Sequence, residues 1–106
     1  MTLSIRQMAI VTAILTGTAS IATAADHTVT IQGFAFSPAE LSIAAGETVT
    51  FTNADSAPHT ATGAGGAFDT GRLNSGDSAT LTFAGAGTFD YACAFHPSMT
   101  AKITVQ

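Results

Sequence analysis

The sequence predicts an all-β fold, an antiparallel sandwich or a small barrel, for most of this 106-residue chain. Apolar and polar residues alternate in short runs, which is the period of half-buried strands. Turn signals rich in glycine, proline and asparagine separate the runs, and no segment after residue 25 shows the period of a helix. Short strands in regular succession are typical of sandwiches and barrels.

Ahead of the strands, residues 1–24 have the three-part pattern of a secretory signal peptide. Arg6 supplies the positive charge, residues 8–15 are mainly apolar, and an Ala-Thr-Ala sequence ending at Ala24 fits a cleavage site. The apolar run is far shorter than the ~20 residues that a membrane-spanning helix needs. We therefore expect export with cleavage after Ala24, with cleavage at Ala22 or Ala25 as the alternatives. Cleavage after Ala24 leaves one domain over residues 25–106.

Four strands are predicted in the first half of this domain. Val29 and Ile31 share one face of the first strand, and Val49 and Phe51 share one face of the fourth. Threonines at the outward positions suit an exposed pleated surface. The predicted strands cover residues 27–32, 34–36, 41–43 and 48–52.

The second half begins with a loop-rich stretch, residues 53–76, in which Gly, Ser, Asn and Asp are frequent. A short strand is predicted within it, and Phe68 is a candidate for the core. Regular alternation then returns, with Phe89, Tyr91 and Cys93 on one face of a single strand. The predicted strands cover residues 59–62, 78–83, 88–93 and 101–105.

The charge of the domain argues against a nucleic-acid partner. The whole chain has a formal net charge of −4. Removal of Arg6 with the leader leaves Arg72 and Lys102 against seven acidic residues, a net charge of −5. Since no basic cluster is available to neutralise phosphates, we expect no nucleic-acid partner.

Three potential metal ligands lie just before the last predicted strand. Cys93, His96 and Met99 follow one another with two residues in each gap, and Cys93 is the only cysteine of the chain. An exported domain normally pairs its cysteines in disulfides. A single cysteine is therefore expected to be a free thiol, an intermolecular bridge or a metal ligand.

Three donors from one loop leave one side of an ion open, and His59 is the best candidate for the missing ligand. It lies behind Pro58 after a predicted strand, whereas His27 opens the first strand and is expected to be an ordinary exposed histidine. Two imidazoles, a thiolate and a weak thioether form the ligand set of blue-copper sites, while structural zinc sites do not use methionine. The residues thus predict a copper site formed by His59, Cys93, His96 and Met99.

An enzymatic alternative makes Cys93 a nucleophile with His96 as its base. That reading gives Met99 no role, and apolar surroundings do not favour an exposed thiolate. A third reading makes Cys93 a buried structural thiol, which is common for a free cysteine. The combination of donors in one loop favours the metal site over both.

The stretches APHT and FDYACAFHPSM resemble the cupredoxin family, and the short C-x-x-H-x-x-M spacing is most similar to its amicyanin type. The resemblance extends over residues 27–105. It implies a Greek-key β-sandwich and one type 1 (blue) copper, with His59, Cys93, His96 and Met99 at the ligand positions. It also implies one-electron transfer in the bacterial periplasm by a monomer that is not an enzyme and has no stable membrane association.

The resemblance further implies redox partner proteins, with a dehydrogenase or another donor on one side and a cytochrome or reductase acceptor on the other. Such partners dock at the edge around the C-terminal histidine ligand, here His96. The apolar ring of that edge would consist of Ala57, Pro58, Ala94, Phe95 and Pro97. A copper chaperone or storage protein that uses the same ligands is the alternative function.

The chain departs from the family pattern at two places. Many relatives have asparagine after the first histidine ligand, where its side chain ties the two ligand loops together, whereas this chain has Thr60. Between the cysteine and the next histidine, Ala94 and Phe95 replace the Thr-Pro of many amicyanin-like chains. We therefore expect a different tie between the loops.

Overall fold

The computed structural model describes residues 24–106, so residues 1–23 of the predicted leader lie outside the described part. The described part contains eight strands and one short 3₁₀ turn, η2 (Ala64–Gly66). The strands are β2 (Asp26–Ile31), β3 (Phe36–Ser37), β4 (Glu40–Ile43), β5 (Thr48–Asn53), β6 (Thr62–Gly63), β7 (Ser78–Thr82), β8 (Gly87–Ala92) and β9 (Thr100–Val105). Among the described residues, no helix is long and apolar enough to cross a membrane.

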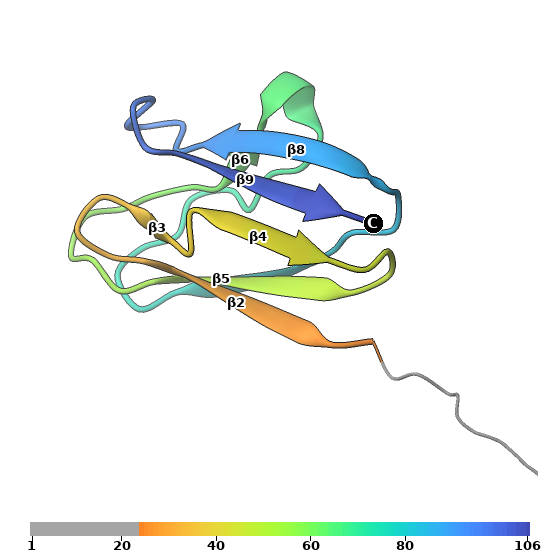
Figure 1. Cartoon of the computed structure of the whole chain (residues 1–106). Coiled ribbons are helices and arrows are strands. Elements are labelled where there is room, and N and C mark those ends of the chain that lie inside the picture. Colours follow the sequence, from red (N-terminus) through yellow and green to blue (C-terminus); the bar gives the residue numbers. More distant parts are fainter. Residues whose placement is uncertain (1–23) are drawn as a thin grey trace, which may run out of the picture.

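The strands form two four-stranded sheets that pack face to face as a sandwich (Figure 1). One sheet has the order β3-β2-β5-β7, and the other has the order β4-β9-β8-β6. The predicted β-sandwich is confirmed, but its sheets are mixed, because β2 pairs with β5 and β4 pairs with β9 in parallel. Parallel neighbours need a crossover connection, and here β3 and β4 lie between β2 and β5 in the chain, with β4 in the opposite sheet.

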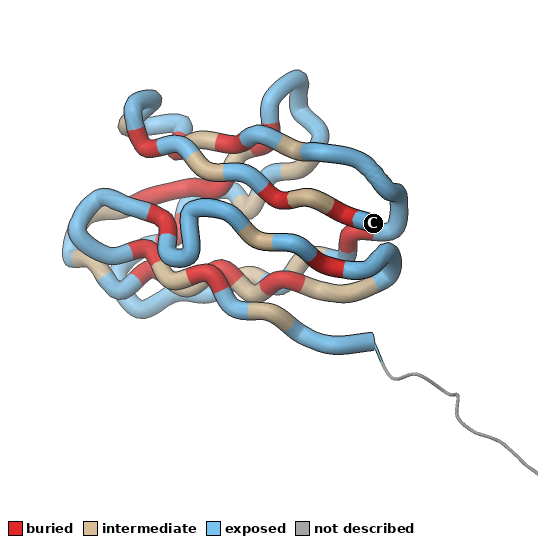
Figure 2. The backbone as a smooth tube through the Cα atoms, in the orientation of Figure 1, coloured by how far each residue is buried: buried red, intermediate tan, exposed pale blue. Residues whose placement is uncertain are grey.

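The core lies between the sheets and follows the predicted alternation (Figure 2). Val29, Val49, Phe51 and Ile103 are fully buried, whereas Leu81 is only partly buried. Aromatic rings fill the centre, where Tyr91 packs edge-on against its neighbours. The rings in contact with it are those of Phe36, Phe51 and Phe68.

The register of the strands places two sets of loops at opposite ends of the sandwich. The pair Ala92↔Thr100 is the last of the β8–β9 ladder, so the loop of residues 93–99 leaves the sandwich at this end. The pair Asp26↔Thr48 is the first of the β2–β5 ladder and lies at the opposite end (Figure 1). The predicted ligands therefore lie far from the start of the domain.

Candidate metal centre

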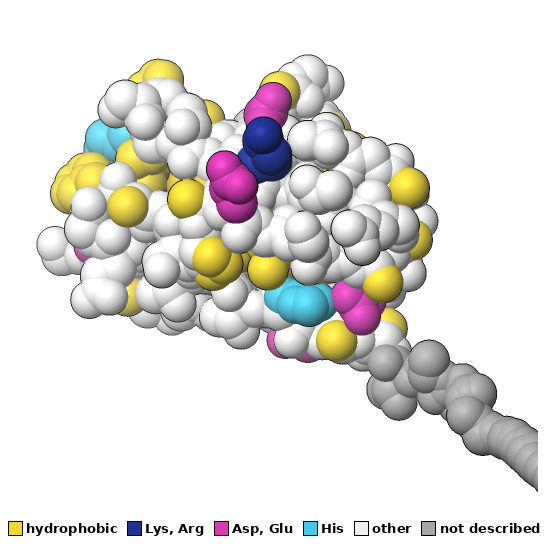
Figure 3. Space-filling model, in the orientation of Figure 1, with side chains coloured by type: hydrophobic (Ala, Val, Ile, Leu, Met, Phe, Trp, Pro, Cys, Tyr) yellow, Lys and Arg dark blue, Asp and Glu magenta, His cyan; other side chains and the backbone are white. Residues whose placement is uncertain are grey.

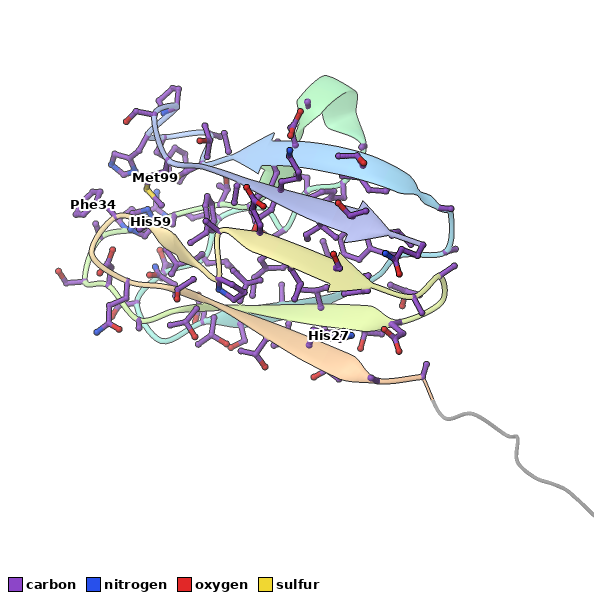
Figure 4. The ribbon with its side chains drawn as sticks, in the orientation of Figure 1. His27, Phe34, His59 and Met99 are labelled. Atoms are coloured by element: carbon purple, nitrogen blue, oxygen red, sulfur yellow. The ribbon has the colours of Figure 1, made fainter. Side chains whose placement is uncertain are left out.

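His59, Cys93 and His96 come together at one end of the sandwich, although they belong to two separate segments. Their potential ligand atoms all lie within 4.8 Å of one another. The Cys93 Sγ atom is 3.7 Å from His59 Nδ1 and 3.6 Å from His96 Nδ1. Met99 belongs to the same loop as Cys93 and is 5% exposed, and its side chain lies at the same end as His59 (Figure 4).

The backbone of His59 is held by an isolated bridge to Leu73. The His59 N–H donates to the Leu73 carbonyl over 3.0 Å, and the Leu73 N–H donates back over 2.7 Å. Asn53 braces the same region, because its side-chain amide donates to the carbonyls of Ala57 and Leu73 over 2.8 and 2.9 Å. The His59 side chain is fully buried, so its ring is fixed from both sides.

The loop that carries the other donors is closed by its own backbone hydrogen bonds. The Cys93 N–H donates to the Met99 carbonyl over 3.1 Å, and the Met99 N–H donates to the His96 carbonyl over 2.9 Å. The His96 N–H in turn donates to the Cys93 carbonyl over 3.3 Å. The loop is therefore tied at both ends without the Thr-Pro sequence of many amicyanin-like chains.

Thr60 ties the two ligand-bearing segments together. Its Oγ1 atom accepts a 2.8 Å hydrogen bond from the Ala94 N–H, and its own N–H donates to Cys93 Sγ over 3.4 Å. Threonine thus makes a direct link between the segment after His59 and the loop after Cys93. The expectation of a different tie is confirmed, and that tie is a short hydrogen bond.

The surroundings of Cys93 favour its thiolate. Burial alone would raise the pKa of this 1% exposed thiol, but hydrogen bonds from the Thr60 N–H and from the His59 and His96 rings oppose that effect. Together they lower the pKa of Cys93 to about 6. Since the thiolate is the form that binds a metal, this cysteine is prepared as a ligand before a metal arrives.

Asp55 is a site residue that the sequence analysis missed. Its carboxylate accepts hydrogen bonds from the backbone N–H groups of Gly33 and Phe34, over 2.7 and 2.9 Å, and lies 2.9 Å from His59 Nε2. A carboxylate only accepts, so His59 carries a proton on Nε2, and its Nδ1 atom is the ring nitrogen that faces Cys93. The two backbone hydrogen bonds hold the pKa of Asp55 below its ordinary value. The only feature of the sequence that could have indicated a role for Asp55 is its position four residues before His59.

The ring of Phe34 covers the two imidazoles. Its centroid lies 5.0 Å from that of His59 and 4.9 Å from that of His96, with nearly perpendicular planes in both pairs. Phe34 has a φ of 56°, a left-handed conformation that is rare for a bulky residue. The Asp55 carboxylate holds this turn through the Phe34 N–H, so one side chain positions both His59 and the ring above it.

Two large apolar side chains are exposed at the same end, Phe34 at 50% and Phe95 at 46%. Hydrophobic side chains border a histidine on this end of the surface (Figure 3). Of the predicted apolar ring, Ala94, Phe95 and Pro97 are exposed, while Ala57 and Pro58 are partly buried. Arg72 lies over the Phe95 ring, 5.8 Å from its centroid.

The donors present fit copper. Two imidazole nitrogens face one thiol, and a thioether is available from the same loop. Soft sulfur ligands suit Cu(I) and imidazole suits copper in both states, whereas a structural zinc site needs four strong donors. The Cys93 sulfur is also buried, so a substrate could not reach it as it would reach an exposed nucleophile.

The family described as the cupredoxin-like domain matches residues 6–105, which is nearly the whole chain. The chain belongs to the cupredoxin-like family. The expected family resemblance is confirmed, and family membership and donor set together identify copper as the cofactor of this cupredoxin.

Solved structures show the same relationship. The Cu(I) form of an amicyanin mutant is 30% identical to this cupredoxin, with a TM-score of 0.73 over 81% of this chain and 87% of that chain. A purple cupredoxin from Nitrosopumilus maritimus is 31% identical, with a TM-score of 0.70 over 76% of this chain and 99% of that chain. No curated protein sequence matches.

One similar structure is an enzyme, a copper-containing nitrite reductase from Thermus scotoductus SA-01. It is 30% identical, with a TM-score of 0.73 over 84% of this chain, but the match spans only 25% of the reductase chain. This cupredoxin therefore corresponds to one part of that longer protein. The likeness to the reductase extends to the fold of that part.

Proposed function

We propose that this cupredoxin is a periplasmic type 1 copper protein that carries single electrons between redox partner proteins. Its ligands are His59, Cys93, His96 and Met99. The observation that carries the proposal is the convergence of two imidazole Nδ1 atoms on one buried thiol at 3.6 and 3.7 Å. Bound copper supplies a one-electron couple between Cu(II) and Cu(I).

The protein residues hold the site in place while its charge changes. The Leu73 bridge fixes His59, and the Thr60–Ala94 hydrogen bond fixes the distance between the two ligand segments. The Phe34 ring packs edge-on against both imidazoles. Because these groups are already fixed without a metal, little rearrangement is needed when an electron arrives or leaves.

The exported state follows from the leader. We propose that residues 1–24 are removed after Ala24 and that residues 25–106 form the periplasmic domain. The single cysteine is compatible with export, because Cys93 is buried at the site and has no disulfide partner among the described residues.

Electrons pass at the apolar edge around His96. This ring is partly exposed and bordered by the exposed Phe34 and Phe95 side chains, so a partner can approach the site without water between the two surfaces. We propose a dehydrogenase or another donor and a cytochrome or reductase acceptor as partners. The protein performs no bond chemistry itself and acts as a monomer.

The visible spectrum of the purified domain tests the proposal. Addition of Cu(II) is expected to give an intense thiolate-to-copper charge-transfer band, and Cys93→Ser is expected to abolish it. His27→Ala is the matched control, because His27 lies at the other end of the sandwich (Figure 4). A copper-loaded domain without this band contradicts the proposal, and so does loss of copper to a mild chelator during repeated redox cycles, which indicates a chaperone.

A further inference from the structure

A second group of nitrogen donors lies at the opposite end of the sandwich from Cys93. It consists of Ala25, Asp26 and His27, the first residues of the domain after the proposed cleavage. His27 lies far from His59 and Met99 (Figure 4). His27 does not match the expectation of an ordinary exposed histidine, because its side chain is only 27% exposed and contacts a carboxylate. The function proposed above gives these residues no role.

Glu47 brings the two ends of this tripeptide together. One carboxylate oxygen lies 2.8 Å from His27 Nε2, and the other accepts a 3.3 Å hydrogen bond from the Ala25 nitrogen. Since the carboxylate is an acceptor, His27 carries its proton on Nε2, and Nδ1 has no hydrogen-bond partner among the described residues. The Ala25 nitrogen and the His27 ring are thus held near one another, with Nδ1 unoccupied.

The order of these residues has a specific chemical consequence. A free amine at position one and a histidine at position three allow a cation to be chelated by the amine, the two intervening amide nitrogens and the imidazole Nδ1. Four nitrogens in a plane suit Cu(II) and Ni(II). The side chain of Asp26 does not interfere, because it accepts hydrogen bonds from Thr48 and Thr50.

We propose that the mature N-terminus of this protein is a second metal site, square-planar and selective for Cu(II) or Ni(II), formed by the Ala25 amine, the amide nitrogens of Asp26 and His27, and His27 Nδ1. It rests on the proposed cleavage after Ala24. Binding releases the two amide protons, and any proton on the amine, to solvent. Glu47 keeps its contact with His27 Nε2 and so orients the metal-bound ring.

Chelation requires a local opening of the first strand. The Thr48 N–H donates to the Ala25 carbonyl over 3.2 Å, and His27 is paired with Val49 in the parallel ladder of β2 and β5. Only the first positions of β2 must leave this ladder, because Val29 and Ile31 anchor the rest of the strand in the core. Ends of chains open at low free-energy cost.

The test uses protein exported and processed from the full chain, with its N-terminus determined by mass spectrometry. One equivalent of copper is added and reduced to Cu(I), and Ni(II) is then titrated while ¹H–¹⁵N spectra are recorded. We expect the Asp26 and His27 amide signals to disappear, because these nitrogens lose their protons. Signals of the loop at residues 93–99 are expected to stay in place.

Two variants isolate the tripeptide. His27→Ala removes the imidazole, and insertion of one glycine before Ala25 moves the histidine to position four while keeping its contact with Glu47. Both are expected to retain the two amide signals in the presence of Ni(II) and to keep the blue colour with Cu(II). If the insertion variant binds Ni(II) like the parent, or if the mature chain starts at another residue, the site is rejected. An absent blue band with intact Ni(II) binding refutes only the electron-carrier function.

Discussion

Asp55 shows how much one side chain contributes to the site. It connects the left-handed turn at Phe34 to the ring of His59, and it is itself oriented by a 2.9 Å hydrogen bond from its own N–H to Asn53 Oδ1. A carboxylate on the outer nitrogen of a ligating histidine raises the basicity of that ligand. Asp55 is therefore expected to stabilise Cu(II) more than Cu(I).

Asp55→Asn is expected to raise the reduction potential. The amide removes the negative charge. Its NH₂ group faces either the Gly33 N–H, or the Phe34 N–H together with His59 Nε2, so at least one hydrogen bond is lost. A tenfold change in the relative affinity for the two copper states corresponds to about 59 mV. Voltammetry measures the potential, and ¹⁵N shifts of His59 in the copper-free protein report its tautomer.

Asp77→Asn is the matched control for that experiment. Asp77 also caps a loop through its carboxylate, which accepts a 2.9 Å hydrogen bond from the Asn74 N–H, but it contacts none of the proposed ligands. Its potential should equal that of the parent protein. Equal shifts in both variants would mean that the effect is a general response to a lost charge.

Met99→Gln tests the weak ligand. Copper is expected to stay bound, and the potential is expected to fall, because an amide oxygen favours Cu(II) over Cu(I) more than a thioether does. Voltammetry with copper quantification on the same sample separates these outcomes. An unchanged potential would show that Met99 is not a copper ligand.

The lowered pKa of Cys93 predicts how the stability of the copper-free protein depends on pH. The folded pKa is about 6, while an unfolded cysteine titrates near pH 8.5. Between these values the unfolded chain binds more protons, so the free energy of unfolding rises with pH. The Cys93 thiolate contributes up to about 3 kcal/mol to the free energy of unfolding. This contribution is complete above about pH 8.5 and is lost as the pH falls to about 6.

Urea unfolding of the copper-free protein at several pH values from 5 to 9 checks this expectation. Cys93→Ala removes the titrating group and should flatten the rise between pH 6 and 8.5. Equal slopes would contradict a thiolate in the folded state.

At the scale of elements, alternation predicted the long strands well and the sheet arrangement less well. The predicted strand over residues 48–52 is β5, and its inward residues are buried as expected. The predicted strand over residues 59–62 is instead a bridge at His59 followed by the two-residue β6. Alternation of apolar and polar residues indicates which face of a strand is buried, but not whether the neighbouring strand runs parallel or antiparallel to it. The parallel pairs β2–β5 and β4–β9 could therefore not be deduced from the sequence pattern.

The site was predictable only in part, for a related reason. Cys93, His96 and Met99 are close in the chain, so their spacing alone indicates a shared ligand. Asp55 and Phe34 meet because a bulky residue adopts a left-handed turn, and no local pattern predicts that conformation. The assignment of the four ligands stays a prediction until a metal-bound form is measured.

Gly63 in β6 is expected to tolerate no side chain. A Cβ atom there would lie 2.8 Å from the Phe68 ring and 3.0 Å from the Phe68 backbone nitrogen. The Gly63 N–H also donates to the Phe68 carbonyl over 2.8 Å, so this backbone cannot move apart freely. Gly63→Ala is expected to lower the free energy of unfolding by about 1–3 kcal/mol.

Gly85→Ala provides the comparison, because no atom lies within 4 Å of a Cβ at that position. It should change stability by less than about 0.5 kcal/mol. Denaturant unfolding of the two copper-free variants measures the difference between their free energies of unfolding. Equal stabilities would show that the β6 segment can shift away from Phe68.

For the whole molecule, copper is expected to raise stability through the link that it makes between the two ligand segments. A ligand at a free concentration of 100 times its Kd stabilises the folded state by about 2.7 kcal/mol when the unfolded chain does not bind it. Thermal unfolding of copper-loaded and copper-free protein should therefore give a higher Tm for the loaded form. A Tm independent of copper would mean that the metal binds the unfolded chain equally well.

The position of β9 has a consequence for the order of events during synthesis. β4 has no neighbour in its sheet except β9, and the loop of residues 93–99 leads directly into β9, whose first pair with β8 is Thr100 with Ala92. An exported chain that has not yet delivered its last strand thus has one sheet incomplete and the donor loop untethered. In the proposed exported state, copper binding is therefore expected to follow the pairing of β9 with β8, which completes the loop of residues 93–99.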